Sequence, residues 1–216
     1  MEQNFPTETV KAAGEPPKKG VANGYSLILP PNWKRIPLRR KSEREAAVKN
    51  IIESACKQLP KNFPRDLVTR YRLEVERRIS IGIKGARKSG GLDFYLPMAD
   101  PGESPIAASF VVGEISAEGD PGRFLGAMTS TGGYDPVDID EAPGARREVV
   151  AEPDAQEGIE LASRRVDYMA AVPGDPGRWL TVSFSTMGGG DPNDDLSDAT
   201  VSLFDAIMTT FRWSSE

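Results

Sequence analysis

The sequence predicts an α+β chain, and three observations lead to this class. Residues 179–186, WLTVSFST, alternate apolar and polar side chains, and residues 166–172 alternate in the same way before the turn PGDPGR. Two runs with a period of two, joined by a glycine- and proline-rich turn, are typical of an antiparallel hairpin. Apolar residues also recur at helical spacing between 42 and 83 and between 194 and 213. The 21 glycines and 18 prolines indicate many turns between these elements.

The first expected element is a strand at 24–30. Tyr25, Leu27 and Leu29 alternate along it, and Pro30–Pro31 end it because proline cannot donate to a β-ladder. We expect this strand to pack against the last helix.

Residues 1–20 are polar, contain prolines and lack periodicity, which predicts a flexible arm. The remaining residues, 21–216, are expected to form a single domain, because a chain of this length suffices for one core. Trp33 and Trp213 are expected near opposite ends of that core.

Two amphipathic helices are expected after the first strand, at 42–59 and from Pro64 to a glycine-rich exit at 85–91. Ser42 and Glu45 have the spacing of a capping box for the first helix. The predicted buried stripes are Val48, Ile51, Ile52, Ala55 and Leu59 in the first helix, and Leu67, Val68, Tyr71, Val75, Ile79 and Ile83 in the second.

The second half of the chain alternates strands, turns and helices. The run 106–115 is apolar on both faces, as in a central strand that is covered on both sides. Between 157 and 172 the apolar phase changes, as a β-bulge would require. The expected elements are strands at 91–97 and 106–115, a helix at 121–131, an acidic turn-rich segment at 132–145, strands at 147–152, 157–172 and 179–186, and a helix at 194–213, capped by Asp194 or Asp195, with the stripe Leu196, Ala199, Leu203, Ile207 and Phe211.

Charge is distributed unevenly along the chain. Residues 34–88 contain 17 Lys and Arg against 6 Asp and Glu, whereas residues 89–216 contain 7 against 23. The basic helices either meet an anionic partner or face the acidic remainder of the chain and solvent. Nucleic acid is disfavoured, because the whole protein is acidic and has no aromatic and basic strand pattern. The predicted partner-binding residues are Lys34, Arg35, Arg39, Arg40 and Lys41.

The composition disfavours most catalytic chemistry. The chain has no histidine and one cysteine, which excludes serine triads, cysteine–histidine dyads, an internal disulfide and most zinc sites. Cys56 lies on an apolar helical stripe, which favours a packing role over that of a nucleophile. Carboxylate, lysine or tyrosine chemistry remains open.

Two stretches resemble ligand-binding loops without completing either pattern. In 82–89 Arg87 stands where a phosphate loop needs its second glycine, and in 191–202 Leu196 and Ser202 replace the glycine and glutamate of a calcium loop. We therefore expect no catalytic, cofactor-binding or metal-binding residues. No apolar run approaches 18 residues and the N-terminus lacks a leader pattern, so we expect a cytoplasmic protein without a membrane span.

The order of elements resembles the Mog1/PsbP-like superfamily, including bacterial proteins of the LpqN and DUF1795 (DcrB-like) kind. The stretches that carry the resemblance are GYSLILPPNW at 24–33, with its P-x-x-W turn, and TVSFST…LSDATVSLFDAIMTTFRW at the C-terminal end. The resemblance covers about residues 24–213 and implies an antiparallel sheet flanked by helices on both faces, an α/β/α sandwich. It also implies binding of other proteins. The chain departs from LpqN-like lipoproteins in lacking a leader and lipid-bearing cysteine, and its basic helical pair at 42–88 is longer than expected.

These observations lead to three functional hypotheses. The first is a non-enzymatic protein–protein interaction module that acts as an adaptor, chaperone or component of a larger assembly. The second is a small-ligand-binding protein or carboxylate-based enzyme, which a deep pocket lined by converging Asp, Glu, Tyr or Arg side chains would support. The third is self-association, in which the basic helices of one subunit meet the acidic half of another.

Overall fold

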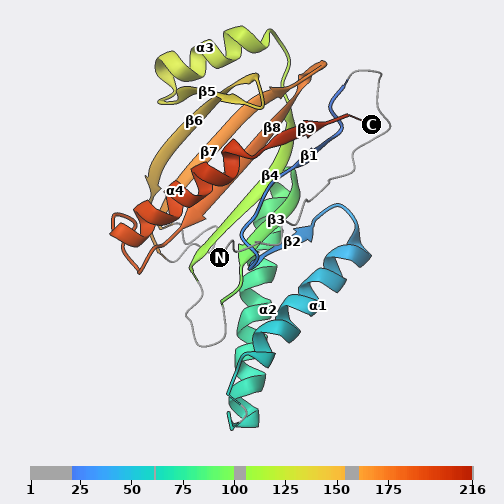
Figure 1. The fold of residues 1–216 in the computed structure, drawn as a ribbon, viewed down its shortest axis with the longest axis vertical. Helices are drawn as coiled ribbons and strands as arrows, with labels where there is room; N and C mark the ends of the chain where they lie inside the picture. The colour runs from blue at the N-terminus through green and yellow to red at the C-terminus, as the bar shows by residue number, and fades with distance from the viewer. Residues whose placement is uncertain (1–20, 61, 100–105, 154–160, 216) are drawn as a thin grey trace, which may run out of the picture.

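The computed structural model describes residues 21–60, 62–99, 106–153 and 161–215, and it confirms the predicted α+β class. The described residues form four helices and nine strands (Figure 1). In chain order these are β1 (Gly24–Ser26), β2 (Trp33–Pro37), α1 (Lys41–Lys57), α2 (Arg65–Lys88), β3 (Gly91–Pro97), β4 (Ala108–Ser116), α3 (Pro121–Thr131), β5 (Asp135–Ile139), β6 (Ala142–Ala151), β7 (Ser163–Val172), β8 (Asp175–Thr186), α4 (Asp195–Thr209) and β9 (Arg212–Ser214).

Seven of the strands form one antiparallel sheet, in the order β2-β3-β4-β8-β7-β6-β5. β4 and β8 are interior strands, as expected for the run that is apolar on both faces, and β7 and β8 form the predicted hairpin. β1 instead pairs with β9, so the two ends of the domain lie side by side (Figure 1).

The sheet separates two hydrophobic clusters. Phe94 and Tyr95 are neighbours on β3 yet belong to different clusters, because successive side chains on a strand point to opposite faces. In the larger cluster Phe204 of α4 stacks on Phe184 of β8, with ring centroids 4.6 Å apart. In the smaller cluster Ile52 of α1 and Ile79 of α2 pack with Phe94.

Tyr25, Leu27 and Leu29 of the first predicted strand belong to the larger cluster, but the strand β1 ends at Ser26, before the prolines that were predicted to end it. Tyr25 stacks on Phe211, with ring centroids 5.6 Å apart, and Trp33 is buried in the same cluster. Trp213 is half-buried against it and donates from Nε1 to the carbonyl of Ile139. The predicted arm at 1–20 lies outside the described residues.

Three strands were not expected. β5 lies in the segment predicted as turns, where two carboxylates and Pro136 obscure the β-pattern; proline is tolerated because β5 is an edge strand. Asp140 and Glu141 have φ angles of 48° and 67° and form a two-residue turn between β5 and β6, although neither is a glycine. β2 contains two of the five predicted basic residues, Lys34 and Arg35, and β9 occupies residues predicted to be helical.

The helices differ from expectation at their ends and on their buried faces. α1 begins at Lys41 with Arg40 as N-cap and no side-chain cap, so the predicted capping box is wrong. α2 continues through Gly85 to Lys88. α4 is capped by Asp194, as predicted, but Leu196 is 44% exposed, and the buried face comprises Ser197, Thr200, Val201, Phe204, Ile207 and Met208.

The predicted bulge falls partly on residues outside the described ranges. From Ser163 to Ala171, β7 pairs with β6 or β8 without a shift of register, and the irregularity lies between Ala171 and Val172 instead. The change of phase near Leu161 therefore reflects the start of β7, not a bulge within it.

The observed buried face of α4 predicts that truncating two of its side chains lowers the free energy of unfolding by different amounts. Phe204→Ala removes a ring that contacts Phe110, Tyr168 and Phe184, and we expect it to lower the free energy of unfolding by about 3–5 kcal/mol. Leu196→Ala, on the exposed side of the same helix, should change it by roughly 0.5 kcal/mol or less. Urea denaturation measures both, and equal losses would contradict this packing.

Candidate functional site

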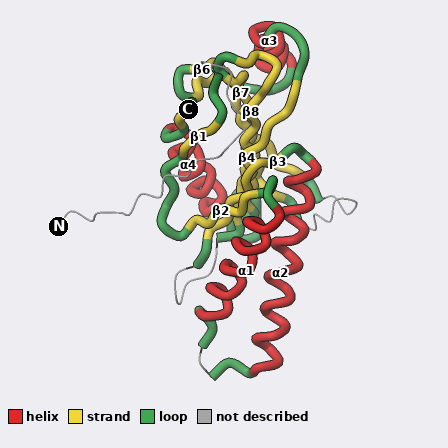
Figure 2. The backbone as a smooth tube through the Cα atoms, turned by 90° about the vertical axis from the view of Figure 1, so that its right-hand side faces the viewer, coloured by secondary structure: helices red, strands yellow, loops and turns green. Residues whose placement is uncertain are grey.

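Helices α1 and α2 form a hairpin that extends well beyond the edge of the sheet. Figures 1 and 2 show the connection between the helices far from the strands, while the C-terminal end of α2 lies against β3 and β4. The buried residues are few: Ile51, Ile52 and Ala55 in α1, and Ile79 and Ala86 in α2. Most of the surface of this hairpin therefore faces solvent.

The far end of the hairpin exposes apolar side chains that were expected to be buried. Leu67 and Tyr71 belong to the predicted stripe of α2, yet they are 39% and 37% exposed. Their exposure has a simple cause: at this end no strand of the described chain lies behind the two helices (Figure 1). Phe63 and Leu73 are exposed nearby.

A largely apolar cavity of about 710 Å³ lies between the two helices and the end of β3. Leu59, Tyr71, Val75 and Met98 are among the residues that line it. Its volume falls within the range of about 300–1,000 Å³ that is usual for ligand pockets. Tyr71 therefore belongs both to the exposed apolar end of the hairpin and to the wall of this cavity.

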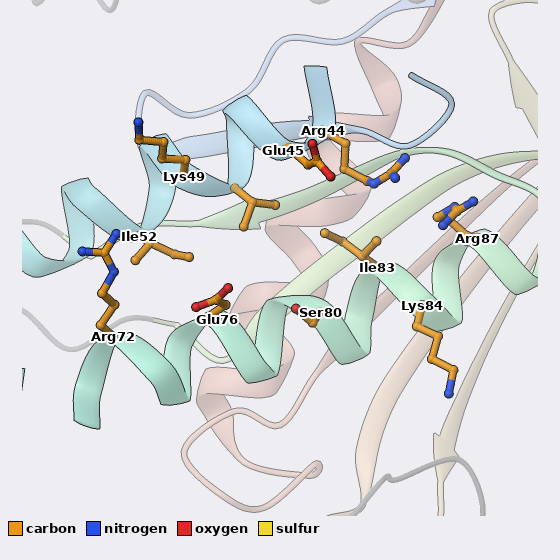
Figure 3. A pocket seen from close by; sticks show the side chains of 11 residues that line it. Arg44, Glu45, Lys49, Ile52, Arg72, Glu76, Ser80, Ile83, Lys84 and Arg87 are labelled. Carbon is orange, nitrogen blue, oxygen red and sulfur yellow. The ribbon is translucent and has the colours of Figure 1, made fainter. Parts of the chain in front are cut away.

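The opposite side of the hairpin carries a cationic groove of about 550 Å³ (Figure 3). Apolar residues of both helices line it, including Ile52 and Ile83. Arg44 of α1 and Arg87 of α2 lie at one end, and Arg72 extends from α2 toward Ile52 (Figure 3). The charged residues of the groove are five cations and two carboxylates: Arg44, Lys49, Arg72, Lys84 and Arg87, with Glu45 and Glu76.

The groove was not identified from the sequence, although a signal for it is present. Arg72, Glu76, Ser80 and Lys84 are spaced four apart and therefore lie along one side of α2. The spacing does not show that α1 lies alongside α2, so that residues of both helices form a groove.

The five basic residues predicted to bind a partner are spread over β2, the segment that follows it and the start of α1. Lys34, Arg39, Arg40 and Lys41 are exposed, whereas Arg35 is half-buried. All of these residues except Lys34 form an ion pair within the chain, with nitrogen and oxygen within 4 Å. The pairs are Arg35–Asp93, Arg39–Glu114, Arg40–Glu43 and Lys41–Glu45.

Two of these pairs, Arg35–Asp93 and Arg39–Glu114, join the basic part of the sequence to the acidic part. An internal charge match, one of the two alternatives that the sequence left open for the basic helices, is therefore present at these two positions, which precede the helices. Because the Arg39–Glu114 pair is exposed, it adds little stability and leaves the guanidinium accessible. A role for this cluster in partner binding stays a prediction.

The Arg35–Asp93 pair belongs to a polar cluster that connects β1, β2 and β3. Tyr25 donates from its hydroxyl to Asp93 Oδ2 at 2.5 Å, and the hydroxyls of Tyr25 and Tyr95 are 2.8 Å apart. Burial, together with the nearby Tyr95 and Asp93, raises the pKa of Tyr25 well above its ordinary value. The cluster is enclosed and fully hydrogen-bonded around Asp93, so we interpret it as structural.

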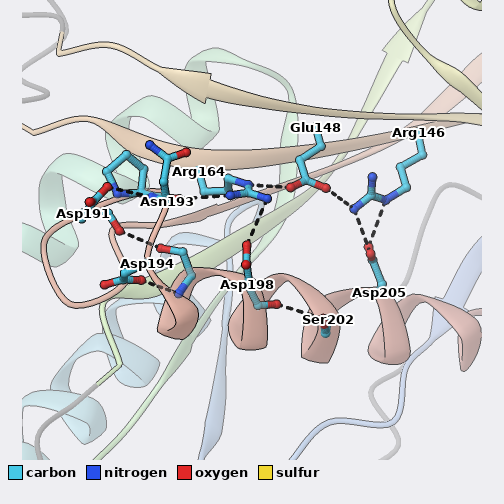
Figure 4. Close-up of polar contacts among 11 residues, drawn as sticks. Arg146, Glu148, Arg164, Asp191, Asn193, Asp194, Asp198, Ser202 and Asp205 are labelled. Atoms are coloured by element: carbon cyan, nitrogen blue, oxygen red, sulfur yellow. Dashed lines mark hydrogen bonds and ion pairs between the residues drawn. The ribbon is translucent and has the colours of Figure 1, made fainter.

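A second polar network fastens α4 to the sheet (Figure 4). Glu148 of β6 accepts from Arg146 at 2.8 Å and from Arg164 of β7 at 2.5 Å. Arg146 reaches Asp205 of α4 at 2.8 Å, and Arg164 reaches Asp198 at 3.2 Å. Burial opposes ionisation of Glu148, but the hydrogen bonds from the two arginines outweigh it and lower the pKa of Glu148.

The described residues contain no group of three or more His, Cys, Asp or Glu side chains placed to hold a metal ion. No helix in the described part of the chain is long and apolar enough to span a membrane. Residues 82–88 are helical, so the glycine-rich stretch is not a phosphate loop, and Asp194 serves as a helix cap. Cys56 is half-buried against the smaller cluster.

Comparisons with known proteins identify no family. No family model and no curated protein matches the chain. Among solved structures, a crystal structure of a protein from Bacteroides thetaiotaomicron VPI-5482 aligns with a TM-score of 0.40 and 8% identity. The alignment covers 89% of this chain and 46% of that one, so the chain spans about half the length of its structural neighbour.

The network around Glu148 predicts a pH-dependent contribution to stability. Glu148→Gln removes the charge that Arg146 and Arg164 share, and we expect it to lower the free energy of unfolding by about 1–2 kcal/mol at pH 7. Because the pKa of Glu148 is lowered in the folded state, this contribution is complete above the unfolded value of 4.5 and is lost as the pH falls through the folded pKa.

Urea denaturation of both proteins between pH 7 and pH 3 measures this effect. The difference between wild type and variant should narrow below about pH 4. Glu118→Gln, at an exposed position, is the matched control and should show no difference at any pH. A gap that stays constant with pH would contradict the assignment to the ionised carboxylate.

Proposed function

We propose that this protein is a non-enzymatic protein–protein interaction module, an adaptor, chaperone or assembly component, whose α1–α2 hairpin binds an acidic and partly apolar segment of a partner. The observation that carries the proposal is the combination of exposed apolar side chains at the end of the hairpin with a cationic groove along it. The Mog1/PsbP-like resemblance of the sequence is in keeping with this class of function.

Hydrophobic contact at the end of the hairpin would supply most of the affinity. Phe63, Leu67, Tyr71 and Leu73 are each at least 36% exposed, and they lie at the protruding end of the hairpin, in the connection and the first turns of α2. Leu67 and Tyr71, four residues apart, share one side of the helix. Covering apolar surface contributes roughly 25 cal/mol per Å². Clustered exposed apolar residues on a monomer commonly mark an interaction surface.

The charges select the partner. With five cations and two carboxylates, the groove attracts acidic segments and repels basic ones. Charge complementarity of this kind contributes mainly to association rate and specificity. The same feature makes binding sensitive to salt, because exposed charges are screened over about 10 Å at 0.1 M ionic strength.

We further propose that the domain is a variant of the α/β/α sandwich, with α4 on one face of the sheet and the hairpin anchored on the other. The separate clusters that contain Phe94 and Tyr95 support this arrangement. In this arrangement the hairpin end is accessible, so a partner can bind there without disturbing the core around Phe204.

Matched variants test the hairpin. Leu67→Ser with Tyr71→Ser changes the apolar end, and Arg72→Glu with Lys84→Glu changes the groove. We expect each pair to weaken binding of a partner by about tenfold or more, because contacts of both kinds are lost. Ile28→Ser and Arg123→Glu change an exposed apolar and an exposed basic residue elsewhere and should leave binding unchanged.

The partner is first recovered from native cells by affinity purification and mass spectrometry, and then purified and titrated against each variant. A purified partner that binds both double variants like the wild type would contradict the proposal. Light scattering at low and high salt gives the mass of the protein alone. If the protein alone forms a salt-sensitive dimer and the Leu67→Ser, Tyr71→Ser pair abolishes it, the partner is a second copy of this chain.

Three of the five predicted basic residues are tested separately. The triple variant Arg39→Glu, Arg40→Glu and Lys41→Glu should abolish recovery of the partner while leaving the fold intact, because all three side chains are exposed. Circular dichroism and thermal unfolding check the fold. Recovery at the wild-type level would restrict the binding surface to the groove and the hairpin end.

A further inference from the structure

A third cavity, of about 560 Å³, lies over the sheet and away from the hairpin end. The C-terminal part of α2 forms one wall, through Gly82, Gly85 and Ser89, and Tyr134, between α3 and β5, lies on another. Its floor consists of side chains from β4, β6, β7 and β8. The volume lies within the range that small-molecule pockets occupy.

The register of the sheet places one row of residues across this floor. Arg147 of β6 lies opposite Asp167 of β7, which lies opposite Ser183 of β8, which lies opposite Val111 of β4. The row is polar beneath Tyr134 and becomes apolar toward α2, where Val111 packs against the smaller cluster. A ligand on this floor would therefore meet charge at one end and hydrocarbon at the other.

Two guanidinium groups share one buried carboxylate at the polar end. Asp167 is 5% exposed and accepts hydrogen bonds from Arg165 Nε at 2.9 Å, Arg147 Nη2 at 3.3 Å and Ser183 Oγ at 2.6 Å. The three charged groups together carry one positive charge in excess. Arg147 also lies over the ring of Tyr134, with its Cζ 4.7 Å from the ring centroid.

Arg147 retains an unused donor. Its Nε is buried and has no hydrogen-bond acceptor in the described structure. Buried N–H donors nearly always have an acceptor, because leaving one unpaired costs about 1–3 kcal/mol. A donor of this kind, on a guanidinium with excess positive charge, points to an anion as the group that completes the site.

We propose that this cavity binds a small organic anion, through a carboxylate or phosphate group that accepts from Arg147. Arg165 adds positive charge beside it, and the hydroxyls of Ser109 and Ser185, opposite each other on β4 and β8, provide further donors. The organic body of the ligand packs on Val111 and Met169. This site does not depend on the proposed function of the hairpin.

The inference also bears on the second functional hypothesis, since arginine, aspartate and tyrosine side chains converge in a pocket beside the sheet. The sequence contains one sign of the polar floor of this pocket. Thr181, Ser183 and Ser185 alternate with buried apolar residues along β8. Such an alternation is expected equally of a strand whose second face meets water, so the sequence alone did not distinguish a binding floor from a solvated one.

Phenyl phosphate and benzoate are suitable probes, because each joins one anionic group to one apolar ring. Titration of ¹⁵N-labelled protein follows the Nε–H signal of Arg147, which is assigned by its disappearance in Arg147→Gln. We expect saturable shifts of this signal with at least one probe, and the tighter of the two identifies the anionic group. Inorganic phosphate, which lacks the ring, should bind about tenfold more weakly than phenyl phosphate.

Two variants test the placement. Arg147→Gln should weaken binding of the better probe by about tenfold or more, because a charge-assisted hydrogen bond is lost. Gly85→Phe adds a ring at the wall, where a Cβ meets nothing within 4 Å, and leaves the Arg147–Asp167 pair intact. It should weaken binding to a similar extent, whereas Arg123→Gln, on α3 and outside the cavity, should not.

Absence of saturable binding by both probes would overturn the proposal. Wild-type affinity in Arg147→Gln would overturn the role of this guanidinium, and wild-type affinity in Gly85→Phe would overturn the location. Because none of these substitutions lies in the hairpin groove or at the hairpin end, partner binding by the same variants reports separately on the proposed function.

Discussion

The alternation of side chains along β8 is the constraint on which the rest of the structure depends. Leu180, Val182 and Phe184 point to one face of the sheet, and Thr181, Ser183 and Ser185 to the other. The apolar face requires a cover, and α4 supplies it with Phe204. The hydroxyl residues of β8 offer little hydrophobic surface for a helix to cover. α3 covers Trp179 at the start of the same strand through Phe124, with ring centroids 4.8 Å apart, and α1 and α2 pack against β2 and β3 instead.

That restriction determines where the hairpin lies. α2 rests on Phe94 of β3, and it approaches so closely at Gly82 that a Cβ there would lie 2.9 Å from the Phe94 ring. α1 packs beside it over β2, through Ile36 and Ile52. With its anchor at the edge of the sheet, the rest of a 24-residue helix has no strand beneath it. The exposed apolar end and the open polar floor are thus two consequences of the same packing.

The sequence predicted elements whose signal is local. The strand at 91–97 and the helix at 121–131 were placed at their observed bounds, because an apolar run between glycine and proline in the first and an Asp–Pro start in the second are properties of the segments themselves. β5 was missed because its stability comes from pairing with β6, and not from its own composition. The buried stripe of α2 was predicted to begin too early, at residues that are exposed. Periodicity shows which face of a helix is apolar, but it does not show how much of that face another element covers.

The candidate sites were less predictable for the same reason. Residues 34–41 form a dense basic cluster in the sequence, yet the structure pairs four of them with carboxylates, two of which lie more than 50 residues away in the chain. The hairpin groove combines Arg44 with Arg87, and the sheet cavity combines Arg147 with Asp167 and Tyr134. Each depends on how elements are packed, which single-sequence patterns do not contain.

The two proposed surfaces differ in how strongly salt screens their charges. The groove between the helices carries five cations and two carboxylates, whereas Arg147 and Arg165 of the cavity lie against the buried Asp167. Exposed charges are screened over about 10 Å at 0.1 M ionic strength, and partly buried pairs are screened much less. Binding of an acidic segment in the groove should therefore weaken more steeply with added salt than binding of an anion in the cavity.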